Sequence, residues 1–173
     1  MIRLTIWPGH WRAWGRRYTE AMAEFRTVTT VAEQQVARGI RYEVFVQEQK
    51  VPLPMEIDSR DDLPTTCQMV LYVDDEPVGT GRLLADPDDA ERIHLGRLAI
   101  RKAWRGQGWG ARLVEALERL AREKYSRETL ICELSAQEYA VGFYENLGYR
   151  LMGRPRYLDA GIWHHDMDKP LRG

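Results

Sequence analysis

Three alternating glycines stand between a strand-like run and a long helical pattern, and no other feature constrains the fold as strongly. The turn is Arg105-Gly106-Gln107-Gly108-Trp109-Gly110, which follows the apolar run at 92–100 and precedes a helical pattern at 111–124. Glycines here let the backbone approach a ligand closely, and the first N–H groups of the helix have no partners within it. Such a helix start attracts anions, phosphates above all. The sequence therefore predicts a phosphate-bearing ligand at residues 105–111.

The composition fits a single globular domain with a short appendage. The chain has 173 residues, of which 44% are hydrophobic and 29% charged, and its net charge of −1 argues against nucleic acid as the main partner. Its apolar runs are shorter than the roughly 18 residues that a membrane span needs. Its start does not resemble a signal peptide, because Pro8-Gly9 interrupts the short apolar run Ile2–Trp7. Cys67 and Cys132 lack metal-ligand spacing, so we expect a cytoplasmic protein with buried, reduced cysteines and no metal.

The first 23 residues differ in composition from the rest of the chain. Tryptophans and arginines crowd together there, at Trp7, Trp11, Trp14, Arg12, Arg16 and Arg17. We interpret residues 1–23 as a Trp/Arg-rich N-terminal extension ahead of one domain at 24–173. The tryptophans need covering by the domain or by a second copy of the chain, so a homodimer is one expected assembly. The extension has too few basic residues for a nucleic-acid or membrane arm.

Alternating strand-like and helical patterns fill the rest of the chain and predict a mixed α/β sheet. Thr30-Val31-Ala32-Glu33 has the form of a capping box and starts a helix whose apolar positions continue to Val44. Residues 47–66 form a Pro- and Asp-rich loop whose length points to a functional role. Gly148 suits the position just after a helix. Strands are expected at 25–31, 68–73, 78–84, 92–100, 129–135, 149–154 and 162–167, and further helices at 111–124 and 138–146.

Two known phosphate-binding motifs compare poorly with the glycine turn. A P-loop requires Gly-Lys-Ser/Thr after the glycines, whereas this chain has Gly110-Ala111-Arg112. A dinucleotide fingerprint fits Gly106, Gly108 and Ala111 literally, but Arg101–Arg105 separates the strand from the first glycine, and a dinucleotide turn follows its strand directly. The hairpins upstream also do not suit a doubly wound sheet. A nicotinamide-dependent oxidoreductase remains an alternative.

The whole run from Arg105 to Gly110 resembles motif A of the GNAT superfamily of acyl-CoA-dependent N-acetyltransferases, (Gln/Arg)-x-x-Gly-x-(Gly/Ala). Downstream, Gln137–Ala140 and Phe143–Tyr149 resemble motif B of that superfamily, with Gln137 where many members have Asn. The segments that resemble the ElaA-like/YjcF-like branch of the superfamily are 44–49 with Pro52 and Asp58, 79–82, and 160–167. The resemblance covers about residues 25–169. It departs from that branch at Cys67, where a His is expected, and at 1–23, which have no counterpart.

The resemblance implies an α/β (α+β) fold with a mixed, mostly antiparallel central sheet and helices on both faces. In that fold the strands at 92–100 and 129–135 splay apart into a V, and acetyl-CoA lies in the gap. The glycine turn would hold the pyrophosphate, and the strand backbone would pair with the pantetheine arm like an added strand. The residues that the resemblance assigns to acetyl-CoA are Leu98, Ala99, Ile100, Arg105, Gly106, Gln107, Gly108, Trp109, Gly110, Ala111, Gln137 and Phe143.

The resemblance also implies catalytic residues. An amine would attack the thioester directly, so an ammonium with a pKa of about 10.4 must first lose its proton. Tyr144 matches the tyrosine that protonates the departing thiolate in many GNAT enzymes. Glu48 is the preferred base, and Asp58, Glu133, His164, a bound water or no base remain open. Arg82 and Arg97 either bind an acidic substrate group or pair with Glu48 or Asp58. The expected substrate-binding residues are Asp58, Arg82, Arg97, Glu133 and His164.

We therefore expect an N-acetyltransferase that moves an acetyl group from acetyl-CoA to an unidentified small-molecule or peptide amine. The alternative is an acyl-CoA sensor or regulatory module that binds the thioester without turnover. No nucleic acid, membrane or metal is expected as a partner. Acidic residues at 56–62 and 86–91 support one hypothesis on the acceptor, namely that these loops attract a cationic amine.

Overall fold

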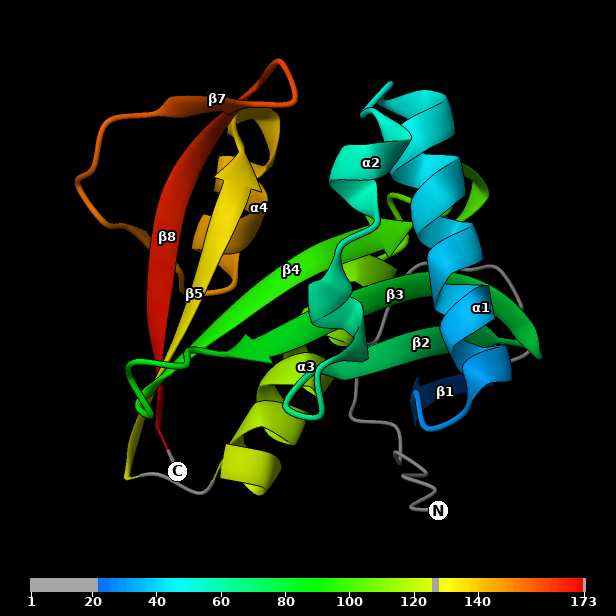
Figure 1. Cartoon of the computed structure of the whole chain (residues 1–173), viewed down its shortest axis with the longest axis horizontal. Helices are drawn as coiled ribbons and strands as arrows, with labels where there is room; N and C mark the ends of the chain where they lie inside the picture. Colours follow the sequence, from blue (N-terminus) through cyan, green and yellow to red (C-terminus); the bar gives the residue numbers. More distant parts are fainter. Residues whose placement is uncertain (1–21, 126–127, 173) are drawn as a thin grey trace, which may run out of the picture.

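An eight-stranded sheet forms the frame of the computed structural model, which describes residues 22–125 and 128–172 (Figure 1). The strands follow the order β1-β2-β3-β4-β5-β8-β6, and β7 also pairs with β8. Neighbouring strands are antiparallel except for β4 and β5, which are parallel, so the predicted mixed, mostly antiparallel sheet is confirmed. The strands are β1 (Ala23–Thr27), β2 (Cys67–Val73), β3 (Glu76–Ala85), β4 (Arg92–Ile100), β5 (Thr129–Gln137), β6 (Arg150–Leu151), β7 (Tyr157–Asp159) and β8 (Ile162–Arg172).

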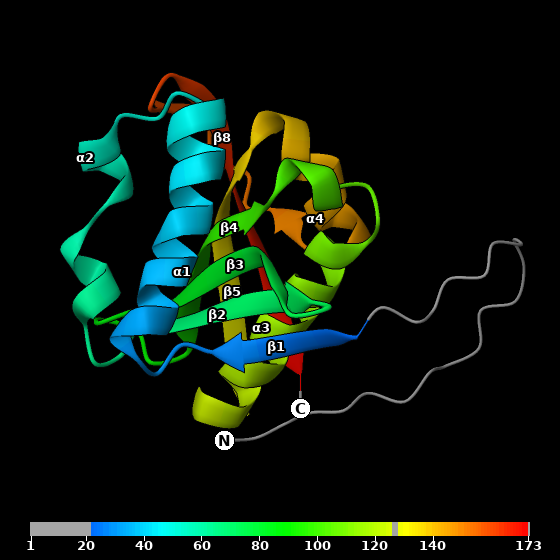
Figure 2. The ribbon, with the colours of Figure 1, turned by 90° about the vertical axis from the view of Figure 1, so that its right-hand side faces the viewer.

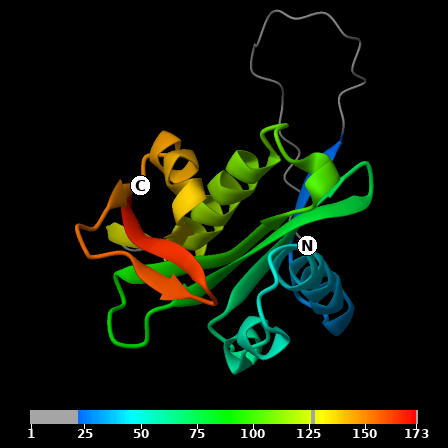
Figure 3. The ribbon, with the colours of Figure 1, turned by 90° about the horizontal axis from the view of Figure 1, so that it is seen from above.

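Helices cover both faces of the sheet, as the view from above shows (Figure 3). α1 and α2 lie on one face and α3 and α4 on the other, and Figure 2 shows α1 and α3 on opposite sides of the strands. Among the described helices, none is long and apolar enough to cross a membrane. The helices are α1 (Val31–Arg41), the π-helical turn η1 (Tyr42–Glu48), α2 (Leu53–Glu56), η2 (Ser59–Asp62), η3 (Lys102–Trp104), α3 (Trp109–Tyr125), η4 (Glu138–Ala140) and α4 (Val141–Asn146).

Local sequence sets the start of α1. The Glu33 N–H donates to Thr30 Oγ1 at 3.2 Å, and Glu33 Oε2 accepts from the Thr30 N–H at 3.0 Å, so the predicted capping box is confirmed. The same carboxylate accepts from the Thr29 N–H at 2.8 Å. These contacts turn the chain out of the sheet, and β1 therefore ends at Thr27 rather than at Val31, although the β-branched residues between favour a strand.

Two apolar cores hold the helices on the sheet. The larger core lies between the sheet and α3, where Leu113, Leu117 and Ala121 of the predicted helical stripe are fully buried. The smaller core joins α1 to the other face through Ala37 and Ile40. Burying one leucine stabilises a fold by roughly 1.5–3 kcal/mol relative to leaving it exposed. The cores fix α1 and α3 against β3 and β4, the strands that border the site.

β4 and β5 separate soon after they meet. They pair at Arg92–His94 with Ile131–Glu133, although β4 continues to Ile100 and β5 to Gln137 (Figure 1). β5 keeps its other neighbour, β8, along its whole length. The predicted V-shaped splay is therefore confirmed. Beyond His94, the β5-facing edge of β4 has no strand partner among the described residues, which leaves backbone N–H and C=O groups for a ligand. The carbonyl oxygen of Ile100, at the end of β4, accepts from Arg105 Nε at 2.7 Å.

Other predicted elements differ from the structure in detail. The segment 47–66 contains α2 and η2 and is not a plain loop. The helix predicted at 138–146 begins with the 3-10 turn η4, and it ends as predicted before Gly148, whose φ is +90°. β7 is an additional strand, because Ala160 and Gly161 both have positive φ and form a tight hairpin turn into β8. The predicted N-terminal extension lies outside the described residues except for Met22 and Ala23.

Candidate active site

A cleft of about 980 Å³ opens where β4 and β5 diverge. We call residues 105–111 its glycine end, and the region around Arg60, Arg82 and Arg97 its arginine end. Glu48, Asp58, Ala99, Gln107 and Glu133 were predicted for the site but do not line the cleft. The predicted residues that line it are Arg82, Arg97, Leu98, Ile100, Arg105, Gly106, Gly108, Trp109, Gly110, Ala111, Gln137, Phe143, Tyr144 and His164.

The glycine end offers backbone N–H groups. Gly106 and Gly108 have φ values of +74° and +82°, which residues with a Cβ rarely adopt. The first helical bond of α3 runs from the Arg112 N–H to the Gly108 carbonyl oxygen at 3.2 Å, so the N–H groups of residues 109–111 have no partner within the helix. The buried indole N–H of Trp109 also lacks an acceptor among the described residues. These donors and the positive end of the helix dipole fit a pyrophosphate.

β4 carries a bulge beside the cleft. Its register with β3 shifts near Arg82, and Arg97 has a φ of +53°, which is uncommon for a residue with a side chain. Leu98 and Ile100, which follow the bulge, line the cleft, whereas Ala99 packs in the smaller core with α1. An extended ligand arm fits along this unpaired edge of β4 in the manner of an added strand.

Tyr144 lies in the wall of the cleft on α4, with 8% of its surface exposed. Its ring packs edge-on against Phe143 and Tyr149, at centroid distances of 4.9 and 5.7 Å. Burial raises the pKa of Tyr144 above its usual value. The phenol therefore stays protonated near neutral pH, so it can give a proton to a leaving group.

At the arginine end, Asp58 is bound by arginines from two strands. Its Oδ1 accepts from Arg82 Nη1 at 3.0 Å, and its Oδ2 accepts from Arg97 Nη2 at 3.0 Å. The pairing of Arg82 and Arg97 with Asp58, one of the two predicted roles, is therefore present. Burial alone would raise the pKa of Asp58, but hydrogen bonds and charge from Arg82 and Arg60 lower it to about 2.

Arg41 fixes the acidic segment that contains Asp58 to α1. The guanidinium is buried, with 1% of the residue exposed. Its Nη1 lies 2.9 Å from both carboxylate oxygens of Asp61, and its Nε contacts the Glu56 carboxylate. Arg82 binds the same Asp61 from the sheet, at 2.7 Å. The segment between α2 and η2 is thus held between α1 and the sheet by buried ion pairs rather than by apolar packing.

Arginines also hold Glu48 and Glu133, which like Asp58 are predicted carboxylates outside the cleft lining. Glu48 Oε2 is 2.8 Å from Arg105 Nη1, at the glycine end. Glu133 pairs with Arg92, where β4 and β5 still run side by side. The Gln107 side chain is turned back onto its own loop. The structure therefore does not bring Glu48, the predicted base, to the cleft wall that holds the other site residues.

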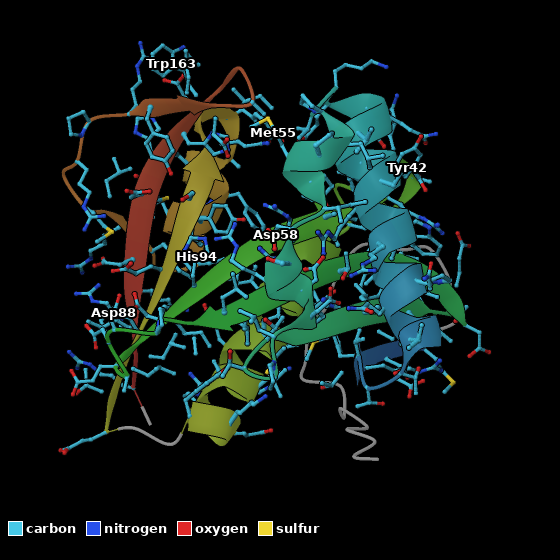
Figure 4. All side chains as sticks on the ribbon, viewed as in Figure 1. Tyr42, Met55, Asp58, Asp88, His94 and Trp163 are labelled. Atoms are coloured by element: carbon cyan, nitrogen blue, oxygen red, sulfur yellow. The ribbon has the colours of Figure 1, made fainter. Side chains whose placement is uncertain are left out.

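His94 is a cleft residue that the sequence analysis missed. It lies on β4 at the point where β5 departs, and Figure 4 shows it with Asp58 near the centre of the molecule. Burial lowers the pKa of His94, and the positive charges of Arg82 and Arg60 lower it further. The imidazole is therefore neutral at pH 7 and able to accept a proton. Its signal in the sequence is a histidine within an apolar strand, which by itself does not show that the strand borders a cleft.

The predicted His164 faces the cleft from β8. Its Nδ1 lies 2.8 Å from the Ile162 carbonyl oxygen, which can only accept, so Nδ1 donates to it. The ring stacks on Tyr157 with a centroid distance of 5.9 Å. These two contacts fix the orientation of the ring in the cleft wall.

A hydrogen-bonded bridge joins the two walls of the cleft. Gln137 lies at the end of β5, and Gln49 lies just after η1. The Gln137 Nε2 donates to Gln49 Oε1 at 3.0 Å. Gln49 Nε2 donates to the Tyr139 hydroxyl at 3.0 Å. Gln49 and Tyr139 are further lining residues that the sequence analysis did not single out.

The model of the acetyltransferase (GNAT) domain family matches residues 27–171. The chain belongs to the GNAT acetyltransferase family. The uncharacterized N-acetyltransferase YjcF of Bacillus subtilis is 36% identical over 130 residues, which cover 75% of this chain and 87% of YjcF. The crystal structure of Escherichia coli ElaA matches with a TM-score of 0.76 at 25% identity, covering 86% of this chain and 99% of ElaA. An acyl-CoA N-acyltransferase from Pseudomonas aeruginosa matches with a TM-score of 0.76 at 27% identity, covering 86% and 99%.

This GNAT domain is an acyl-CoA-dependent N-acyltransferase. The donors at the glycine end and the unpaired edge of β4 fit the two parts of an acyl-CoA, its pyrophosphate and its amide-bearing arm. Within 22–125 and 128–172, no three His, Cys, Asp or Glu side chains are grouped as metal ligands.

Proposed function

We propose that this GNAT domain transfers the acetyl group of acetyl-CoA to an amine by direct attack on the thioester. One observation carries the proposal: a single cleft joins unpaired backbone donors at its glycine end to neutral His94 and protonated Tyr144. A cytoplasmic location is part of the proposal. It is supported by Cys67 and Cys132, which are both free and buried.

In this proposal the backbone holds the cosubstrate. The N–H groups of residues 109–111 bind the pyrophosphate, and Arg105 adds a positive charge beside it. The unpaired edge of β4 at Leu98 and Ile100 pairs with the pantetheine amides. An N–H of this edge polarises the thioester carbonyl as it becomes an oxyanion. Placing the amine and thioester in one cleft supplies much of the rate enhancement through proximity.

Proton transfers accompany the reaction. His94 accepts the proton that the acceptor ammonium must lose, because its imidazole is neutral at pH 7. The amine nitrogen bonds to the acyl carbon while the C–S bond breaks, and Tyr144 protonates the sulfur that leaves. The nitrogen then loses its second proton to become an amide, and this proton restores the Tyr144 phenol, so the proton held by His94 is the one released to solvent. In this proposal Glu48 is not the general base. Its ion pair with Arg105 instead orients the positive charge at the glycine end.

The test is calorimetric binding of acetyl-CoA, with NAD and ATP as control ligands, to the natural chain and to two tryptophan variants. Gly108 and Gly153 both have positive φ and open space where a Cβ would stand, but Gly153 does not line the cleft. Gly108→Trp should weaken acetyl-CoA binding at least about 100-fold, because several charge-assisted hydrogen bonds are lost together. Gly153→Trp should leave binding unchanged.

Equal weakening by both substitutions, or no acetyl-CoA binding by the natural chain, would contradict the proposed function. An amine screen that follows release of the CoA thiol then tests turnover. Tight, selective binding of acetyl-CoA without acyl transfer to any amine would favour the acyl-CoA sensor instead.

A further inference from the structure

The arginine end contains more positive charge than its own carboxylates neutralise. Asp58 Oδ2 alone accepts from three guanidiniums: Arg60 Nη2 at 3.1 Å, Arg82 Nη2 at 3.2 Å and Arg97 Nη2 at 3.0 Å. All three arginines line the cleft, whereas Asp58 does not. A single carboxylate saturates few of the donors that three guanidinium groups offer.

The neighbouring carboxylates do not remove this surplus. Glu56 and Asp61 are both bound by Arg41, which lies on the far side of the segment, and they also pair with Arg97 and Arg82. The network also contains Arg38, which pairs with Asp61 and Asp62. Its five guanidiniums, those of Arg38, Arg41, Arg60, Arg82 and Arg97, therefore face four carboxylates, those of Glu56, Asp58, Asp61 and Asp62, which leaves one positive charge in excess. Of the acidic residues in the segment 56–62, Glu56 lines the cleft, and its carboxylate is already paired with Arg41 and Arg97.

Two further observations agree with a positive surplus that faces the cleft. The Nε of Arg82, a residue with 2% of its surface exposed, is buried and has no hydrogen-bond acceptor among the described residues. Burial and the charges of Arg82 and Arg41 lower the pKa of Arg97, and burial with the charges of Arg82 and Arg60 lowers the pKa of His94.

On the opposite wall, Asp159 of β7 lines the cleft and offers a carboxylate to an ammonium group.

We propose that the acceptor is an amine that also carries a carboxylate, as an amino acid does, and that Arg60 and Arg97 bind this carboxylate. The inference rests on the proposed function, because the acceptor amine must lie in the same cleft as the thioester. A carboxylate matches the single excess charge and the planar, bidentate geometry of guanidinium donors. Arg60 is the residue to test, because 59% of its side chain is exposed and it pairs with Asp58 alone among the described residues.

The experiment measures acetyl transfer, by release of the CoA thiol, to the common L-amino acids and to the C-terminal amide of each. Each pair has the same amine and side chain and differs in the carboxylate. Spermidine and a peptide amide serve as acceptors without a carboxylate. We expect kcat/KM for the preferred amino acid to exceed that for its amide at least tenfold, because the amide lacks the charge-assisted bonds that a carboxylate makes to guanidinium groups.

Arg60→Gln should raise the KM for that amino acid about tenfold and reduce its preference over the amide to less than about threefold. Its matched control is Arg154→Gln, since Arg154 is similarly exposed at 61% and ion-paired, but lies outside the cleft lining. This variant should retain the preference.

The outcomes separate the inference from the proposed function. Transfer to an amide, spermidine or the peptide amide as efficient as transfer to any amino acid would overturn the carboxylate inference and leave the acetyltransferase intact. An unchanged preference in Arg60→Gln would overturn the assignment of the carboxylate to Arg60. No transfer to any of these amines, with acetyl-CoA bound, would overturn the proposed function and the inference with it.

Discussion

The two ends of the cleft are built in different ways. At the glycine end, consecutive residues 105–111 supply backbone N–H groups, and their conformation depends on positive φ at two glycines. At the arginine end, charged side chains meet from α1, β3, β4 and the α2–η2 segment, and Arg41 and Asp61 are almost fully buried. One end is a local backbone structure, and the other is a long-range network of ion pairs.

In the proposed function, this difference corresponds to what each end recognises: the glycine end binds the cosubstrate and the arginine end binds the acceptor. A pyrophosphate is the same in every acyl-CoA, and a short backbone segment is sufficient to bind it. An acceptor differs between enzymes, and side chains on separate elements can change one at a time without altering the glycine turn. We therefore expect substitutions at the arginine end to affect both folding and acceptor use, and side-chain substitutions at the glycine end to affect cosubstrate binding alone.

The largest expected effect is on stability, from Arg41→Met. The substitution keeps much of the side-chain volume but leaves the buried carboxylates of Glu56 and Asp61 without the partner that joins them to α1. Breaking a buried ion pair in this way lowers the free energy of unfolding by about 3–5 kcal/mol. Urea unfolding measures it, and the matched control is Arg154→Met, whose exposed pair with Asp166 should contribute less than about 0.5 kcal/mol.

The pH dependence of unfolding gives an independent measurement of the same network. In the folded state the pKa of Asp58 is lowered to about 2, and that of Asp61 is also lowered. Their contribution to stability is therefore complete above the unfolded value of about 3.9 and is lost as the pH falls toward 2. A loss below 1 kcal/mol in Arg41→Met, or no decline in stability between pH 4 and 2, would contradict a charge-based arginine end.

The same contrast explains what sequence reasoning reached and what it missed. The strand, glycine turn and helix around 105–111 are adjacent in sequence, so local patterns predicted their structure and the splay followed from the family resemblance. Glu48 was predicted as a base from the family resemblance, but its side chain is bound by Arg105, across a long sequence separation. His94 and Arg60 became visible as cleft residues only when strand pairing and η2 brought them there, because no local pattern encodes long-range pairing.

His94→Gln tests the proposed general base, which lies in the cleft between its two ends. We expect the substitution to lower kcat/KM about 100-fold, at the low end of the range for loss of a general base. In the natural enzyme kcat/KM should fall as the pH drops below the pKa of His94. Burial and the positive charges of Arg82, Arg60 and Arg97 lower this pKa from its usual value of 6.5, and the negative charge of Asp166 opposes them. The variant should lose this acid limb. His165→Gln is the matched control, because His165 does not line the cleft. An acid limb that persists in His94→Gln would assign the base elsewhere.

Tyr144→Phe should have a smaller effect, a decrease of about tenfold in kcat with an unchanged KM for acetyl-CoA. A thiol has a pKa of about 8.5, so its thiolate leaves readily and needs less help than the amine. Tyr149→Phe is the control: it removes a buried hydroxyl that donates to Cys132 Sγ at 3.2 Å, outside the cleft lining. Full kcat in Tyr144→Phe under conditions where chemistry limits the rate would exclude Tyr144 as the acid.

The smallest expected effect belongs to the glycine end, where Arg105→Gln should weaken acetyl-CoA binding about fourfold and leave the free energy of unfolding unchanged. Arg105 is 42% exposed and its pair with Glu48 is partly solvated, so one charge there contributes little beside the backbone donors. Arg101→Gln is the matched control, because Arg101 is ion-paired to Glu43 and does not line the cleft.

Glu48→Gln should tighten acetyl-CoA binding about twofold, since it releases the charge of Arg105 toward the phosphates, and should leave kcat unchanged. A fall in kcat of about 100-fold in Glu48→Gln would instead return the role of base to Glu48, and the glycine end would then contribute to the chemistry as well as to binding.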